Sequence, residues 1–173
     1  YKGWQVLKST DATIQGKLQM VLSALAGHPV EVIGSGRTDA GVHAIGQVAN
    51  FHLDEHFSAE EIFEDLNRHL PEDIAVTKIK EVDDRFHSRY QAVEKTYRYR
   101  IRTSPVPNVF ERKFLYQYGQ TLDVDKMKKA AQALVGTHDF ASFCGNRHMK
   151  KSTVRTIFSI DLVERDGEIE ILY

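Results

Sequence analysis

The sequence predicts an α+β fold in which two ferredoxin-like halves share one mostly antiparallel sheet, with helices on one side. Strand-like and helix-like segments alternate along the 173 residues, without the long parallel βαβ series of a doubly wound fold. Apolar and polar residues alternate at positions 97–102 and 153–164, as they do in strands with one buried face. Asp166-Gly167 then joins two strand-like segments and is a strong hairpin signal.

Three helices are predicted from their N-terminal caps. Each begins after a residue whose side-chain oxygen can accept a hydrogen bond from a free backbone N–H of the first turn. The capping residues are Thr13, Ser58 and Asp123, and the helices are expected at residues 14–26, from 59 to about 69, and at 124–135. The apolar residues of the first helix repeat at helical spacing, which indicates a stripe that faces a core.

Strands are expected at residues 30–33, 47–52, 74–82, 90–103, 153–164 and 168–173. Pro105 and Pro107 lie in a segment that favours a junction between domains. The predicted domains are therefore residues 1–104, which include the glycine-rich stretch at residues 34–51, and residues 105–173.

Composition indicates a soluble globular protein, with 42% hydrophobic and 27% charged residues. The net charge of −1 argues against a nucleic-acid partner, but the charge is segregated. Residues 54–65 hold six acids and no Lys or Arg, whereas residues 95–102 and 145–155 hold four bases each and no acid. The single cysteine fits a reducing cytosol, so we expect a cytoplasmic protein. No apolar run approaches a membrane span, and no membrane partner is expected.

The most informative stretch, residues 34–51, reads GSGRTDAGVHAIGQVANF. Its four glycines suggest sharp turns with positive φ and the close approach of another molecule. A neighbouring Arg37 favours the ionised form of Asp39, and an ionised Asp is a competent nucleophile or general base. A glycine-rich turn with a surface ion pair would explain the same residues without any function.

Two other motifs are weaker. The sequence from Gly34 begins like a dinucleotide-binding fingerprint, but that fingerprint requires a third glycine where this chain has Asp39, and a helix afterwards. His52 to His56 matches the zinc-protease pattern H-x-x-E-H. A zinc site of this kind needs both histidines on one helix, whereas the predicted helix starts only after Ser58. A zinc hydrolase is therefore a remote alternative.

The run RTDAGVHAIGQV at residues 37–48 resembles the signature of the TruA-type family of tRNA pseudouridine synthases. Shorter matches to the family extend over essentially the whole chain; they are GWQ at 3–5, LPEDI at 70–74, FHSRY at 86–90, YRY at 97–99 and GTHDFASF at 136–143. The resemblance implies the pseudouridine synthase fold, isomerase activity that converts uridine to pseudouridine at tRNA positions 38–40 of the anticodon stem-loop, and no cofactor.

The resemblance also assigns roles to individual residues. It implies that Asp39 is catalytic, as nucleophile or base, and that Tyr97 lies over the target base. The other substrate-binding residues expected are Arg37, His43 and Gln47. Contacts to the RNA backbone are expected from basic residues that alternate along one strand or cluster nearby, namely Arg98, Arg100, Arg102, Arg147, Lys150 and Lys151.

The resemblance further implies tRNA as partner, a homodimer, and no metal. The family continues beyond the last strand into a segment F-L-x-x-M-V-R, whose Arg pairs with the catalytic Asp, and this segment lies past Tyr173. An alternative from another class follows, in which the chain is a tRNA-binding module that is inactive because its ends are missing.

Overall fold

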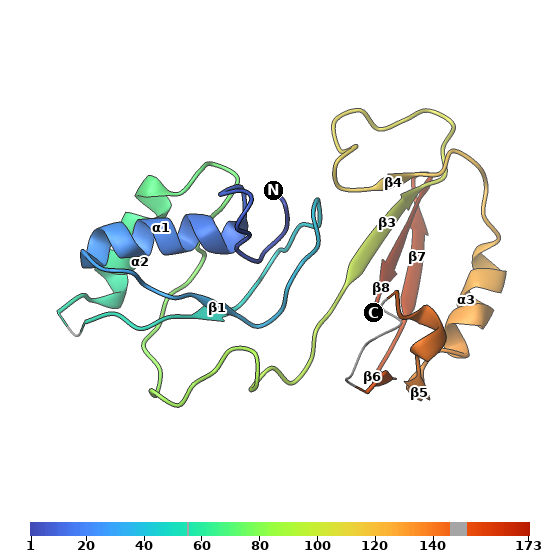
Figure 1. Cartoon of the computed structure of the whole chain (residues 1–173). Coiled ribbons are helices and arrows are strands. Elements are labelled where there is room, and N and C mark those ends of the chain that lie inside the picture. The colour runs from blue at the N-terminus through green and yellow to red at the C-terminus, as the bar shows by residue number, and fades with distance from the viewer. Residues whose placement is uncertain (55, 146–151) are drawn as a thin grey trace. The chain divides into compact units, whose positions relative to one another are not determined.

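The computed structural model describes residues 1–54, 56–145 and 152–173, which form two compact units, Tyr1–Val93 and Glu94–Tyr173 (Figure 1). The division falls before the predicted boundary at residue 104, because strand β3 (Arg98–Arg102) pairs along its whole length with β8 (Glu168–Leu172). Tyr97 therefore belongs to the C-terminal unit, whereas Asp39 belongs to the N-terminal unit. Helices and sheets both contribute to the fold, which confirms its mixed α+β content.

The N-terminal unit holds the two helices that the caps predict, α1 (Ile14–Ala26) and α2 (Ala59–His69). The Thr13 side chain accepts a hydrogen bond from the backbone N–H of Gly16. Ser58 and Glu61 form a reciprocal capping box at the start of α2. These caps satisfy backbone donors that a helix leaves free at its N-terminus, and both predictions are confirmed.

The core of the N-terminal unit forms where α1 packs against α2. Leu22 of α1 and Leu66 of α2 are almost completely buried. Trp4 and Val32 join them, which ties the first residues of the chain and the approach to strand β1 to the same core. Burial of a side chain of this size stabilises a fold by about 1.5–3 kcal/mol relative to exposure.

The strands of the N-terminal unit are shorter than predicted. β1 (Ile33–Gly34) and β2 (Ala49–Asn50) form a two-residue antiparallel ladder. The prediction of a strand at residues 74–82 is wrong, and the side chain of Asn67 supplies a physical reason. Its amide donates to the carbonyl of Val76 and accepts from the N–H of Val76, both at 2.9 Å. These bonds occupy the groups through which Val76 would pair with a neighbouring strand.

The C-terminal unit is built on a four-stranded sheet in the order β4-β3-β8-β7 (Figure 1). β4 (Tyr116–Gln117) is parallel to β3, and the other neighbours are antiparallel. β7 (Asp161–Arg165) turns into β8 through Asp166 and Gly167, whose φ angles are 52° and 73°. Two successive positive φ angles define the tight hairpin turn that the sequence predicts, so this prediction is confirmed.

Helix α3 (Val124–Gln132) begins after its predicted cap, Asp123, and ends earlier than residue 135. It is followed by β5 (Gly136–Asp139), which pairs with β6 (Val154–Ile157), and by a short 3-10 helix, η1 (Ala141–Phe143). The prediction of one strand over residues 153–164 is wrong, because β6 and β7 pair with different partners. Within the described residues, no helix has both the length and the apolar character that crossing a membrane requires.

Candidate active site

The glycine-rich stretch forms the long connection between β1 and β2, and its two predicted chemical groups are accessible. The side chains of Arg37 and Asp39 are both exposed, as is His43 further along the loop. Among the residues that the structure describes, no ion pair joins Arg37 to Asp39. A surface ion pair between these two residues therefore does not explain the motif, and both side chains can meet a ligand.

The backbone at Thr38, between Arg37 and Asp39, is held in place by the first residues of the chain. The carbonyl of Thr38 accepts a hydrogen bond of 3.0 Å from the N–H of Trp4. Gly3 has φ 94°, and a Cβ at this position would lie 2.5 Å from the Thr38 carbonyl oxygen. Only glycine therefore allows this close approach. Because Trp4 is a member of the hydrophobic core, the centre of the motif is tied directly to that core.

A turn follows the candidate catalytic residue. The carbonyl of Asp39 accepts a hydrogen bond of 3.1 Å from the N–H of Val42, and Gly41 has φ 78°. A positive φ at the third position of a four-residue turn is the type II geometry, for which glycine is preferred. The expectation that the glycines make turns holds at Gly41 but not at Gly34 or Gly46, which do not adopt positive φ.

Gly34 is required for space. A Cβ at this position would lie 2.5 Å from ring carbons of Trp4, and the Trp4 side chain is 4% exposed. The ring has no room to move within the core, so the absence of a side chain at Gly34 lets β1 lie directly on it.

Gln47 lies half-buried at the far end of the loop. Its Oε1 accepts from the hydroxyl of Ser35 at 2.7 Å, and its Nε2 donates to the carbonyl of Gly36 at 2.8 Å. The N–H of Ser35 also donates to the carbonyl of Val48 at 2.8 Å. Both polar atoms of the Gln47 amide thus form hydrogen bonds inside the loop, although the resemblance predicts that this residue binds the substrate.

The FHSRY segment supports the same ladder. The hydroxyl of Ser88 donates to the carbonyl of Ile33 at 2.7 Å, and its N–H donates to Oδ1 of Asn50 at 3.0 Å. Ser88 and Asn50 are buried. Asn50 and Trp4 cannot be recognised from the sequence as contributors to the site, because no local pattern reveals bonds between segments this far apart in the chain.

Tyr97, in the C-terminal unit, is 51% exposed and lies against Tyr173. Their ring centroids are 5.4 Å apart with an interplanar angle of 22°, and their backbones exchange two hydrogen bonds. Burial raises the pKa of the Tyr173 hydroxyl, and the nearby Tyr97 and Tyr99 add to the effect. No local pattern identifies Tyr173, which directly follows β8 and lies opposite Tyr97, the residue directly before β3.

The arginines that alternate along β3 all meet carboxylates. Arg100 binds Glu111 through two nitrogens, at 2.9 and 3.1 Å, and Glu168 at 2.7 Å. The hydrogen bonds that Arg100 donates to Glu111 and then to Glu168 raise the pKa of Arg100, and the bond with Arg100 lowers the pKa of Glu111. Arg102 approaches Glu168 at 3.5 Å, and Arg98 approaches Glu170 at 3.7 Å. Their predicted contacts with RNA stay a prediction.

Two predictions remain, the basic cluster near residue 150 and the zinc-like histidine pattern. Arg147, Lys150 and Lys151 lie outside the described residues. In the zinc-like pattern, α2 begins only at Ala59, after both histidines, and no group of three or more potential metal ligands occurs among the described residues.

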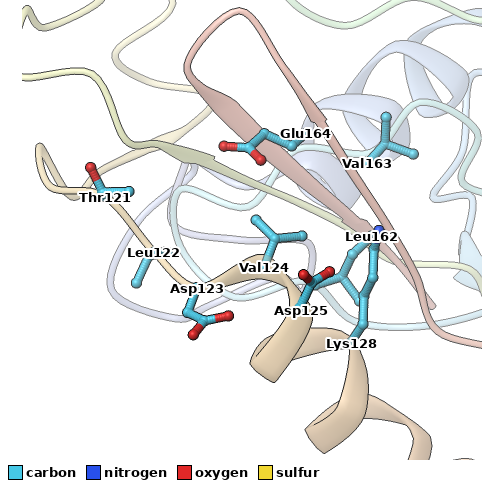
Figure 2. Close-up of a pocket in the computed structure, with 9 residues that line it drawn as sticks. All are labelled: Thr121, Leu122, Asp123, Val124, Asp125, Lys128, Leu162, Val163 and Glu164. Atoms are coloured by element: carbon cyan, nitrogen blue, oxygen red, sulfur yellow. The ribbon is translucent and has the colours of Figure 1, made fainter.

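A hollow in the C-terminal unit lies between the start of α3 and β7 (Figure 2). Its lining residues are Thr121, Leu122, Asp123, Val124, Asp125, Lys128, Leu162, Val163 and Glu164. Since none of the predicted site residues is among them, this hollow is not part of the candidate site.

Comparison of the sequence with known proteins identifies the family of the chain. A family model described as tRNA pseudouridine synthase matches residues 2–91 and 130–172. The tRNA pseudouridine synthase A of Bacillus sp. (strain KSM-64) is 50% identical over 171 residues, which cover 99% of this chain and 70% of the relative. The tRNA pseudouridine synthase A 2 of Bacillus anthracis is 46% identical over the same shares. The tRNA pseudouridine synthase A of Limosilactobacillus reuteri (strain DSM 20016) is 42% identical over 176 residues, covering this whole chain and 68% of the relative.

The chain belongs to the tRNA pseudouridine synthase family. Pseudouridine synthases are isomerases, so the prediction of an isomerase is confirmed. The family match spans both ends of the glycine-rich loop and the FHSRY segment, which the structure brings together around β1 and β2.

The contact between β1 and Trp4 predicts a difference between two glycine substitutions. Gly34→Ala should lower the free energy of unfolding by about 1–3 kcal/mol, because the new methyl group overlaps a buried ring. Gly46→Ala is the matched control, since no atom lies within 4 Å of its added Cβ. Urea unfolding of both variants measures the difference. Equal stability of the two variants would show that the ring of Trp4 does not limit the space at β1.

Proposed function

We propose that this protein converts uridine to pseudouridine at tRNA positions 38–40 in the anticodon stem-loop, with Asp39 as the catalytic carboxylate. The observation that carries the proposal is the arrangement of the Arg37-Thr38-Asp39 triplet. Its central carbonyl is fixed to the core segment at Trp4, whereas the side chains on either side are exposed. A fixed backbone with an accessible carboxylate is what a nucleophile or base requires.

The reaction is an isomerisation, and its atoms balance without a co-reactant. The bond between N1 of uracil and C1′ of the ribose breaks, the base rotates, and a bond forms between C5 and C1′. The hydrogen that leaves C5 is replaced by one gained at N1, so no redox change occurs. The proposal therefore includes no cofactor. Asp39 acts either by attacking the sugar or by removing a proton from it.

The target base must leave its stem before the carboxylate can reach the sugar, which costs a few kcal/mol. Exposed residues supply groups suited to the extruded nucleotide. The guanidinium of Arg37 is a planar donor suited to a phosphate or a base edge. The half-exposed ring of Tyr97 offers a stacking surface for the base, with Tyr173 behind it. His43 is exposed on the same loop as Asp39 and completes the proposed set.

The sheet of the C-terminal unit offers a further contact for RNA. Arg98 is the most exposed of the three β3 arginines, with 45% of its side chain exposed. Arg100 is held by two carboxylates, so a phosphate would have to displace Glu111 or Glu168 to reach it. We therefore rank Arg98 above Arg100 as a contact to the RNA backbone. The ferredoxin-like arrangement of the two units and the homodimer remain part of the proposal.

The role of Asp39 predicts a selective loss of activity. Asp39→Asn keeps the size of the side chain and removes its charge, so pseudouridine formation should fall at least about a hundredfold. Binding of tRNA should change little, since Asp39 is exposed and makes no ion pair with Arg37. Single-turnover pseudouridine formation and a filter-binding isotherm on the same transcript measure the two quantities. An Asn variant that retained more than about one per cent of the parental rate would remove Asp39 from the catalytic role.

Tyr97 is expected to act through its ring. Tyr97→Phe retains the aromatic face and should keep appreciable activity, whereas Tyr97→Ala should lose roughly 1–3 kcal/mol of base stacking. The single-turnover rates of the two variants, compared at the same tRNA concentration, make the test. If both substitutions were equally damaging, the hydroxyl would be the functional group and the stacking role would be excluded.

A further inference from the structure

We propose that Gln47 is a positioning residue that, together with Ser35, closes the base of the catalytic loop and sets the place of the Arg37-Thr38-Asp39 triplet. The inference rests on the proposed function of Asp39 and gives Gln47 a role other than substrate binding. Its basis is the pair of hydrogen bonds by which the Gln47 amide spans the loop.

The loop needs such a closure because its own ladder is short. β1 and β2 pair through only two residues each, Ile33 with Asn50 and Gly34 with Ala49. The bond from the N–H of Ser35 to the carbonyl of Val48 adds one further step. Beyond Ser35, the next bond across the loop comes from a side chain. The Gln47 amide donates to the carbonyl of Gly36, the residue directly before Arg37.

The chemistry of the three groups fixes the orientation of the amide. The carbonyl of Gly36 can only accept a hydrogen bond, so the atom that faces it must be the NH2 group of Gln47. The oxygen of the amide then faces Ser35, whose hydroxyl donates to it at 2.7 Å. Because both polar atoms have a partner in this orientation, the half-buried side chain is held in one position.

This closure acts on the triplet together with the contact at Trp4. Gln47 holds the carbonyl of Gly36, and Trp4 holds the carbonyl of Thr38. The backbone is thus fixed immediately before Arg37 and immediately before Asp39. Loss of the Gln47 contact should free the backbone at Gly36, while the bond from Trp4 still holds the carbonyl of Thr38. A displacement of about 1 Å at a reacting group can cost a hundredfold in rate.

The test compares Gln47→Leu, which removes both hydrogen bonds at similar size, with the parental protein. We expect kcat for pseudouridine formation to fall about ten- to a hundredfold, while the Kd for tRNA changes less than about twofold. Gln132→Leu, at an exposed position of α3, is the matched control and should leave both values unchanged. A raised Kd with unchanged kcat would assign Gln47 to the substrate and overturn the proposal.

Ser35 provides the second arm. Ser35→Ala removes the donor to Gln47 and should lower kcat, and Ser35→Thr retains a hydroxyl and should restore most of the activity. Ser35→Ala should add little to the effect of Gln47→Leu, because both substitutions break the same contact. Fully additive effects would overturn the proposal.

Asp39→Asn, assayed in parallel, separates the role of Asp39 from the role of Gln47. If that variant remains active, the catalytic role of Asp39 fails; if it is inactive while Gln47→Leu keeps the parental kcat, only the positioning role fails.

Discussion

The hydrogen bond from the N–H of Trp4 to the carbonyl of Thr38 is the contact on which the candidate site depends. Trp4 belongs to the hydrophobic core that α1 and α2 build, so this bond joins the centre of the Arg37-Thr38-Asp39 triplet to the core of the N-terminal unit. Glycines make the contact possible, because a side chain at Gly3 would strike the carbonyl and one at Gly34 would strike the Trp4 ring. The loop is long and exposed, yet its central residue is fixed by packing beneath it.

In the candidate site, the backbone groups form hydrogen bonds within the protein, whereas the side chains of Arg37 and Asp39 are exposed. Backbone carbonyls at Gly36, Thr38 and Asp39 take up hydrogen bonds within the protein, from Gln47, Trp4 and Val42 respectively. The side chains of Arg37 and Asp39 make no ion pair with each other and stay exposed. Restraint of the backbone lowers the entropy that the loop loses when a nucleotide binds, which is the usual benefit of preorganisation.

Caps and turns were the features most readily predicted from sequence. The Thr13 and Ser58 caps and the Asp166-Gly167 turn are formed by residues close together in the chain, and each was confirmed. The strand expected at residues 74–82 does not form, because the Asn67 side chain of α2 binds the backbone N–H and carbonyl of Val76 that a neighbouring strand would need. Local patterns contain no information on such a partner.

The difference between features set by neighbouring residues and features set by distant residues applies to the candidate site as well. The RTDAGVH motif singles out Arg37 and Asp39 by resemblance, and the family match includes this segment of the chain. The roles of the two residues stay predictions. The supporting contacts could not be predicted, because Trp4 and Ser88 reach the segment around Arg37 and Asp39 from distant parts of the chain. The contact of Tyr173 with Tyr97, within the C-terminal unit, is equally distant in the sequence. The alternating arginines of β3 suggest an open basic surface in the sequence, but in the structure each forms an ion pair with Glu168 or Glu170 of β8.

The most direct test of the account is to map pseudouridine on tRNA transcripts after incubation with the protein. Transcripts that carry uridine at only one of positions 38, 39 or 40 would be treated with carbodiimide and read by primer extension. We expect a stop in the anticodon stem-loop with the parental protein, and no stop on a transcript that lacks uridine at all three positions. Pseudouridine elsewhere in the transcript, or tight binding of tRNA without any isomerisation, would contradict it.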